Sequence, residues 1–321
     1  MKTFLTKILL FPCLVSTALF FGCKENSAEQ NSKELAINTL DTSNTIKEKP
    51  SKKPLSEDFK KYWYNGKAEI TSYTLEQARY GQLREGHSVL IYVTEPFLPK
   101  KQVKADGKNA DNVNVLKLNA TKKFLTGIYP YSVMSSTFYP VYDNQHAIKT
   151  SLSMQEWCGH VYSQINNRDQ FEFTSHSYFE SEADQNLSLE KDLLENEIWT
   201  KIRIDPSDLP TGNLKIIPSL EYIRLRHKEL KAYNATANFS THNGVSSYTI
   251  TYPNLERTLT INFTSEFPYT IENWTEEFKS GFGPKAKMLT TKATKLKSLK
   301  TAYWGQNGNE DMILRDSLGL K

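Results

Sequence analysis

Three side chains that can carry nucleophilic chemistry lie close together in the segment EWCGHVYSQ. Glu156, Cys158 and His160 are spaced two residues apart. A cysteine becomes a nucleophile when a base such as histidine lies within about 2.6–3.2 Å of its sulfur. The segment therefore raises one catalytic hypothesis, an enzyme that uses Cys158 with His160 and Glu156 in support.

The expected backbone around these residues argues against that chemistry. Extended segments, residues 148–154 and 171–180, flank the motif, so we expect EWCGHVYSQ to be a strand. Side chains two residues apart on a strand share a face but stand about 6.5–7 Å apart at the backbone. A strand also supplies no helix dipole to stabilise a thiolate. The sequence therefore favours a core strand with a small buried thiol beside a packed Trp157, and the enzyme remains an alternative.

The other reactive residue types do not form a recognisable motif. Cys158 is the only cysteine after Cys23, which excludes an internal disulfide and a cysteine-based zinc site in that part of the chain. The loop 106–112 lacks EF-hand spacing, and no phosphate-binding glycine loop is present. We expect no metal and no cofactor. The remaining histidines are scattered: His87, His146, His176, His227 and His242.

The amino terminus has the composition of an export signal. Basic Lys2 and Lys7 precede an apolar run, residues 8–21, that is too short to span a bilayer comfortably. Cys23 then follows a small residue, which looks like the cleavage site of a bacterial lipoprotein. That likeness implies removal of residues 1–22, with diacylglycerol on the Cys23 sulfur and an acyl chain such as palmitate on its amine. The alternative is a plain cleaved signal.

The chain after the leader divides into a tether and a domain. Residues 23–56 are rich in Ser, Asn, Lys and Glu and contain no aromatic residue. Such a segment cannot bury enough apolar surface to offset its ordering entropy. Residues 57–321 are enough for one large core, and no second linker interrupts them, so we expect a single domain. The formal charge of +4 gives no support to a nucleic-acid partner.

Strand patterns dominate the domain. Residues 258–264 alternate polar and apolar side chains, which is typical of a half-buried strand. Asn243-Gly244 predicts a hairpin between two such runs, because both turn residues must accept positive φ. Arg84-Glu85-Gly86 predicts a further turn. We expect a mainly β fold of the β-rich α+β kind, with a large curved antiparallel sheet resembling a half-barrel.

Helical patterns are few. One principal helix is predicted near residues 188–200, where Ser188 can cap the start and Leu189, Leu193, Leu194, Ile198 and Trp199 recur at helical spacing. This helix is available to cover one face of the sheet.

Lysines crowd two segments of the domain, residues 100–104 and 285–300. One interpretation is contact with anionic lipid headgroups or acidic polysaccharide. The favoured interpretation is that lysines keep an exposed edge strand from pairing with other chains.

Residues 62–106, EWCGHVYSQ and the closing AYWGQNGNEDMILRDSLGL together resemble a family of uncharacterised Bacteroidota-type lipoproteins. Its members are sometimes labelled septum formation inhibitor Maf. Maf enzymes are cytosolic nucleotide pyrophosphatases with an N-terminal Ser-Pro-Arg-Arg segment, which this chain lacks. The resemblance therefore implies an exported lipoprotein but no activity, and no functional residues are carried over from it.

These patterns together predict a non-catalytic, lipid-anchored protein of the cell envelope. It would be held in the outer membrane by lipid on Cys23, either facing the periplasm or exposed at the surface. Aromatic side chains on strands with few convergent polar groups favour an apolar ligand or lipid in a groove of the curved sheet. The alternatives are a docking lipoprotein that binds an envelope protein and the Cys158–His160 enzyme.

Overall fold

The computed structural model describes residues 54–142 and 145–320. The predicted leader, residues 1–22, and the predicted lipidation site Cys23 lie outside the described residues, as does most of the tether. The described residues all fall within one compact unit, which has its own clusters of buried apolar side chains. This segment is therefore expected to fold without the residues that precede it.

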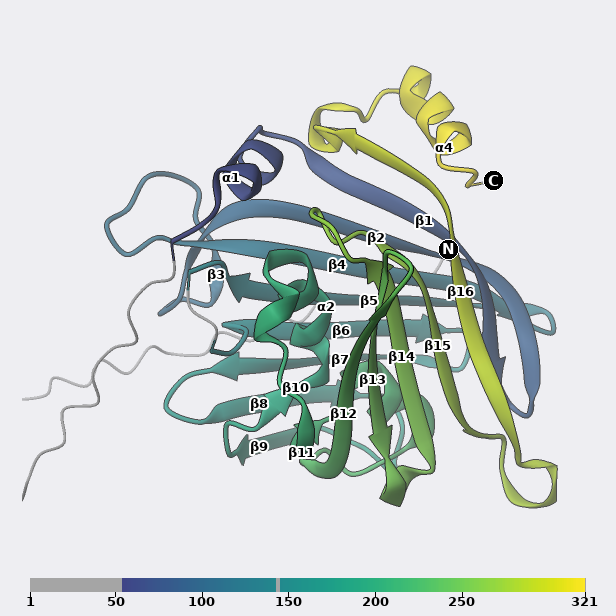
Figure 1. Ribbon diagram of the computed structural model, residues 1–321. Helices are drawn as coiled ribbons and strands as arrows, with labels where there is room; N and C mark the ends of the chain where they lie inside the picture. The colour runs from purple at the N-terminus through teal and green to yellow at the C-terminus, as the bar shows by residue number, and fades with distance from the viewer. Residues whose placement is uncertain (1–53, 143–144, 321) are drawn as a thin grey trace, which may run out of the picture. The chain divides into compact units, whose positions relative to one another are not determined.

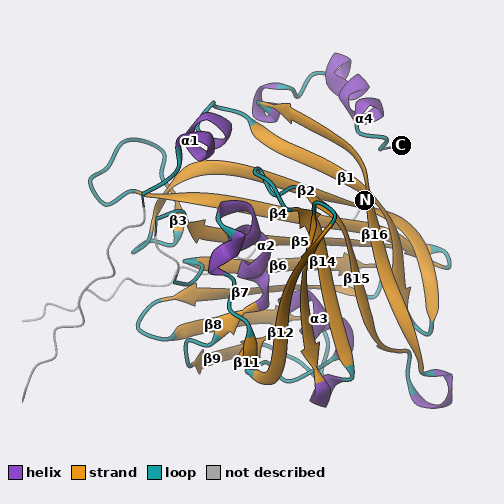
Figure 2. Cartoon of the chain, in the orientation of Figure 1, coloured by secondary structure: helices purple, strands orange, loops and turns teal. Residues whose placement is uncertain are grey.

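The described part of the chain is mostly strand (Figure 2). The helices are α1 (Glu57–Trp63), α2 (Glu195–Ile204), α3 (Leu220–Arg226) and α4 (Ile313–Ser317). Sixteen strands are found in the described ranges, and their bounds are β1 (Ala68–Arg79), β2 (Gln82–Leu98), β3 (Val103–Lys104), β4 (Val113–Thr126), β5 (Tyr129–Pro140), β6 (Lys149–Glu156), β7 (Gly159–Asn167), β8 (Phe171–Ser177), β9 (Gln185–Leu189), β10 (Leu193–Leu194), β11 (Gly212–Ile217), β12 (Tyr233–His242), β13 (Val245–Tyr252), β14 (Arg257–Thr264), β15 (Ile271–Ser280) and β16 (Lys287–Thr301).

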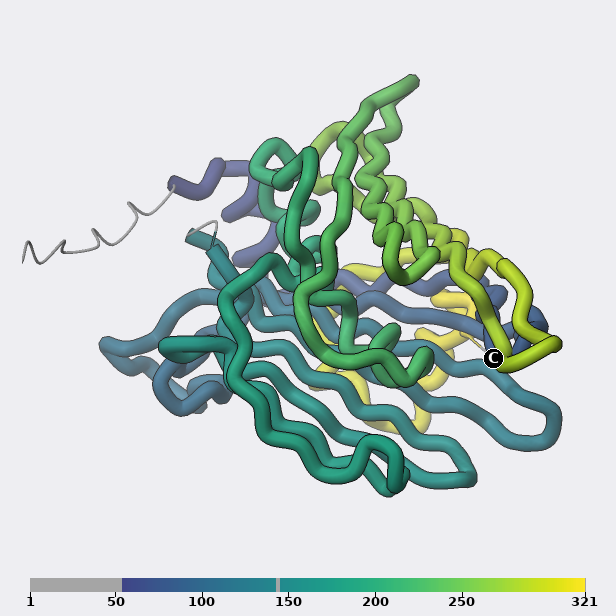
Figure 3. The backbone as a smooth tube through the Cα atoms, turned by 90° about the horizontal axis from the view of Figure 1, so that it is seen from below, coloured from purple at the N-terminus to yellow at the C-terminus, as the bar shows by residue number. Residues whose placement is uncertain are grey.

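All these strands belong to one sheet. Its order is β10-β11-β12-β13-β14-β15-β16-β1-β2-β4-β5-β6-β7-β8-β9, with β3 paired to β2 alone. The β10–β11 pair is parallel and the others are antiparallel. The sheet is open and curved (Figure 1), so strands β4–β9 and strands β12–β15 form two limbs (Figure 3). The predicted mainly β fold with a large curved antiparallel sheet is confirmed.

Local signals placed several strands correctly. In β14 buried and half-buried residues alternate along the whole strand, as the alternation in the sequence predicts. Asn243 and Gly244 join β12 to β13 with φ of 49° and 77°, which confirms that hairpin.

The turn predicted at Arg84-Glu85-Gly86 is wrong. The turn joining β1 to β2 lies at Tyr80 and Gly81, and Gly86 is inside β2 opposite Phe124. A Cβ atom at Gly86 would lie 2.2 Å from the Lys123 carbonyl oxygen. This glycine therefore allows two strands to approach closely and does not end one.

The principal helix exists, but it begins at Glu195 and not near residue 188. Leu189 pairs with Phe171 in the β8–β9 ladder, and Leu193–Leu194 pair with β11. Strand pairing therefore takes the first half of the predicted helix. The Glu197 side chain accepts a hydrogen bond from the Leu194 N–H at 3.3 Å, which satisfies one donor at the helix start.

Helices α2 and α3 cover the concave face of the sheet and share its main core. Ile198 and Ile202 of α2, with Leu220 and Leu225 of α3, are buried against apolar residues of both limbs. The opposite face is covered at β1 and β2 by the C-terminal segment, where Leu318 and Leu320 form a smaller cluster. The main core therefore lies on the face that carries α2 and α3, and a smaller core lies on the opposite face at β1 and β2.

A buried ion pair fixes the end of α2 to β1. Arg203 donates two hydrogen bonds to Glu69, at 2.6 and 2.7 Å, and both side chains are at most 3% exposed. Arg203 also donates to the Pro268 carbonyl at 2.8 Å. A paired, bidentate geometry is what makes two buried charges tolerable.

Removing one partner of this pair is expected to destabilise the fold strongly. Glu69→Ala leaves the Arg203 charge buried without compensation, and the free energy of unfolding should fall by about 3–5 kcal/mol. Glu57→Ala removes the exposed partner of Lys60 and is the control, with little expected change. Urea unfolding followed by tryptophan fluorescence measures both variants, and equal losses would contradict the role given to the buried pair.

The same pair predicts a loss of stability in acid. Burial raises the pKa of Glu69, but the charge and hydrogen bonds of Arg203 outweigh burial and hold the pKa below its ordinary value of 4.5. The folded state therefore binds fewer protons than the unfolded state near that pH. The contribution is present above about pH 4.5 and is lost as pH falls towards the lower folded pKa. Urea unfolding from about pH 7 to pH 3 should show a shallower decline for Glu69→Gln than for the unchanged chain; identical declines would refute the assignment.

Candidate functional site

The predicted catalytic residues lie at a hairpin tip and not within one strand. β6 ends at Glu156, Trp157 and Cys158 form the turn, and β7 begins at Gly159. His160 pairs across the hairpin with Gln155. The prediction of a core strand through this segment is therefore wrong, because the chain reverses direction at its middle.

The side chains at this tip are exposed. Cys158 and His160 are exposed, and Trp157 retains 69% of its accessible surface, so the thiol is not the buried core residue expected beside a packed tryptophan. A hydrogen bond to Glu156 and the charge of that carboxylate raise the pKa of the Cys158 thiol. A raised pKa disfavours the thiolate, which is the nucleophilic form.

Two further points concern metal ligands and the lysine-rich segments. In the stretches that it describes, no group of His, Cys, Asp and Glu side chains is arranged to hold a metal ion. The edge-protection interpretation of the late lysines is wrong, because β16 lies between β15 and β1 inside the sheet. The edges of the sheet path are β9 and β10 instead.

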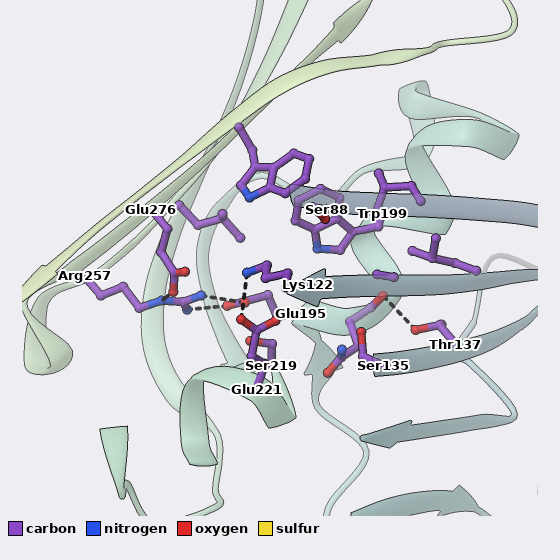
Figure 4. A pocket seen from close by; sticks show the side chains of 16 residues that line it. Ser88, Lys122, Ser135, Thr137, Glu195, Trp199, Ser219, Glu221, Arg257 and Glu276 are labelled. Atoms are coloured by element: carbon purple, nitrogen blue, oxygen red, sulfur yellow. Dashed lines mark hydrogen bonds and ion pairs between the residues drawn. The ribbon is translucent and has the colours of Figure 1, made fainter. Parts of the chain in front are cut away.

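A small central cavity lies between the two limbs of the sheet, with a volume of about 60 Å³ (Figure 4). Its apolar lining comes from Leu90 of β2, Leu118 of β4, Leu259 of β14, Trp274 of β15 and Trp199 of α2. The rings of Trp199 and Trp274 meet edge to face at 5.2 Å. This volume holds a few water molecules and is far below that of usual small-molecule sites.

Charged side chains enter this central cavity, and they are paired with one another. Arg257 of β14 donates to Glu195 of α2 at 2.7 Å and to Glu276 of β15 at 2.7 Å. Lys122 of β4 donates to Glu221 of α3 at 2.7 Å. Figure 4 shows the two clusters facing each other.

The charge states of this cluster follow from its pairing. Burial raises the pKa of Glu195, but the charge and hydrogen bonds of Arg257 outweigh it and hold the pKa below its ordinary value. Tyr252 also donates to Glu195, at 2.7 Å. These ion pairs tie the helices to the strands, and the lowered pKa of Glu195 means that this carboxylate is not poised as a general acid near neutral pH.

A second hollow lies on the same face of the sheet beside α3, and we call it the lateral groove. Its volume is about 310 Å³, which is within the range of small-molecule sites. Strands β7–β9 form one wall, and α3 with the following residues forms the other. Its apolar lining consists of Val161, Phe173, Leu187, Leu220, Ile223 and Leu230.

A polar cluster lies at one side of the lateral groove. Glu182 accepts a hydrogen bond from Arg224 at 2.9 Å and from Ser177 at 2.9 Å, and its oxygen lies 2.8 Å from His227 Nδ1. Burial raises the pKa of Glu182, but its bond with His227 and the charge of Arg224 lower it below the ordinary value. The carboxylate is therefore ionised, and Arg224, Ser177 and His227 all contact it.

Arg224 retains an unused hydrogen-bond donor at this cluster. Its side chain is only 9% exposed, and its guanidinium lies 4.4 Å from the Phe179 ring centroid. Among the described residues, the Arg224 Nε has no hydrogen-bond partner. A buried unpaired donor carries a desolvation cost, which an oxygen atom of a ligand in the groove would relieve.

Sequence reasoning missed this groove. His227 was one of the scattered histidines, and Glu182 is far from it in the chain. Basic residues in the last turn of α3 and at its C-terminal cap, Arg224, Arg226 and His227, were the available signal. No local signal places Glu182 beside them, because the β8–β9 loop brings it there.

Comparison with known proteins gives no relative: no protein-family model, no curated protein and no solved structure matches the chain. Within the described ranges, no helix is both long and apolar enough to cross a membrane.

The position of Cys158 predicts how its thiol reacts. In the folded protein it should label without denaturant, because it is exposed, and no faster than an unperturbed thiol, because Glu156 raises its pKa. Glu156→Gln should increase the labelling rate near neutral pH. Stopped-flow reaction with a chromogenic disulfide measures both rates. Labelling of the unchanged protein much faster than of a free cysteine peptide would contradict this account.

Proposed function

We propose that the chain is a non-catalytic, lipid-anchored protein of the cell envelope that binds an amphipathic ligand in the lateral groove. The observation that carries the proposal is the coincidence of an apolar groove of about 310 Å³ with the unpaired Arg224 donor. The apolar walls suit an acyl or other hydrocarbon portion, and the Arg224 end suits an oxygen-bearing group.

The same geometry gives the enzyme alternative little support. Cys158 and His160 lie on the hairpin tip, whereas the lateral groove is lined by residues of β7–β9 and the α3 region. The raised pKa of Cys158 opposes nucleophilic use. Binding without conversion is therefore the proposal that the described residues favour.

A docking role has one specific observation in its favour. Edge strand β9 pairs only with β8, and three of its five residues are exposed. An exposed edge can accept a further strand from a partner protein. Because Leu187 of β9 also lines the lateral groove, a partner strand and a small ligand would bind side by side.

The ligand proposal is tested by recovering the ligand with the protein. Residues 24–321, exported to the periplasm without the lipid cysteine, should co-purify with an apolar or amphipathic molecule visible by native mass spectrometry and solvent extraction. Leu187→Lys places a charge in the apolar wall at a position that is already 41% exposed, so occupancy should fall at least about ten-fold.

Leu83→Lys is the matched control, because Leu83 is 48% exposed and does not line the groove. Its occupancy should equal that of the unchanged chain. A protein that never carries a ligand, or one whose ligand is unaffected by Leu187→Lys, would exclude the lateral groove as the binding site.

A further inference from the structure

One end of the sheet collects large apolar side chains in solvent. The turns β1–β2, β4–β5, β6–β7 and β15–β16 all lie at this end, because neighbouring strands run antiparallel with Gly86 opposite Phe124 and Ser132 opposite Gln155. Several of these turns appear towards the right of Figure 1. The exposed fractions are 81% for Ile128, 69% for Trp157 and 53% for Phe282.

The tips of these hairpins are joined by contacts between aromatic residues. The ring of Phe282 lies 6.5 Å from that of Tyr80, and Tyr129 lies 6.3 Å from Trp157. Tyr80 shares a 2.9 Å hydrogen bond with Tyr131, whose ring is 6.0 Å from that of Tyr129. We call the set Tyr80, Ile128, Tyr129, Trp157 and Phe282 the hairpin-tip rim.

Two long segments that reach the rim contain no acidic residue, whereas Glu85 and Glu156 lie near the rim in other segments. Residues 124–142, which carry Ile128 and Tyr129, contain no charged residue, and residues 278–309 contain no acidic residue. Lys279, Lys285 and Lys287 are exposed beside Phe282. Since β16 is internal, these lysines do not protect a sheet edge.

We propose that the hairpin-tip rim binds the surface of a bilayer that contains anionic lipid. Tryptophan and tyrosine favour the interface between headgroups and acyl chains, and lysines near the surface bind anionic headgroups. Lysine is depleted in protein–protein interfaces, so the lysine-rich arm fits a lipid partner better than a protein partner. The neighbouring β8–β9 loop carries exposed acidic residues, Glu180 and Asp184. Anionic headgroups repel these residues, so the proposed contact is confined to the turns β1–β2, β4–β5, β6–β7 and β15–β16.

This surface acts independently of the Cys23 lipid and of the lateral groove. It would be a second membrane contact, added to the lipid proposed on Cys23. The chain without lipid is therefore the right material for the test.

The test is binding of residues 24–321, without lipid, to sedimented vesicles of phosphatidylcholine with about 30% phosphatidylglycerol. The unchanged chain should bind these vesicles and bind pure phosphatidylcholine at least about ten-fold more weakly. Trp157→Ser with Ile128→Ser should weaken binding to the anionic vesicles at least about ten-fold. Both positions are mostly exposed, so the fold should be unaffected.

The matched control is Trp304→Ser with Ile313→Ser. These residues are 53% and 67% exposed and belong to the C-terminal segment, beyond the opposite end of β16. The control should bind as the unchanged chain does. No binding by the unchanged chain, or equal losses in the two double variants, would overturn the proposal.

A fluorophore on Cys158 gives a second readout, because this thiol is exposed at the rim. Its emission should shift to the blue on addition of anionic vesicles. The same label on Lys108→Cys in a Cys158→Ser background, in the loop before β4, should not respond. An unchanged emission at Cys158 overturns the proposal, as does rim-dependent capture of an envelope protein without vesicle binding.

Discussion

Two buried arginine–glutamate pairs hold α2 in place, and the arrangement of the concave face depends on them. Glu195 at the first residue of α2 pairs with Arg257 of β14, and Arg203 near its last residue pairs with Glu69 of β1. Each pair is buried, bidentate and surrounded by further donors, which is the geometry that offsets desolvation. With both ends fixed, α2 covers the centre of the sheet and leaves only a small cavity beneath it. The lateral groove, which is larger than this cavity, lies beside α3 instead.

The order of the strands explains why a lysine-rich strand is not an edge strand in this protein. β16 pairs with β1, so strands from the two ends of the domain meet in the middle of the sheet. A lysine-rich strand that looks like a protected edge is thus internal, and its lysines project from a face or a tip. One of the two true edges, β9, has no charged residue and lies beside the lateral groove. The antiparallel order also gathers alternate turns at one end, which is how separate aromatic residues come to form the hairpin-tip rim.

The sheet therefore offers two kinds of surface with different chemistry. The lateral groove combines apolar walls with a buried, partly unsatisfied arginine, whereas the rim combines exposed aromatic side chains with solvated lysines. The first suits a single molecule that is enclosed, and the second suits an extended anionic surface. Both are built from the limb β4–β9 together with segments that are distant in sequence.

Local chemistry in the sequence determined the strand-rich fold, the Asn243-Gly244 hairpin and the alternation of β14, because each depends on residues a few positions apart. The sequence also shows that Cys158 is the only cysteine among the described residues, so it has no disulfide partner there. Only the tertiary structure decided where α2 begins, because long-range pairing of Leu189 and Leu193 with other strands overrides their helical spacing. It likewise decided that Cys158 is exposed, that Glu182 meets Arg224 and His227, and that β16 is internal. These features depend on contacts between segments far apart in the chain, and such contacts leave no periodicity in a single sequence.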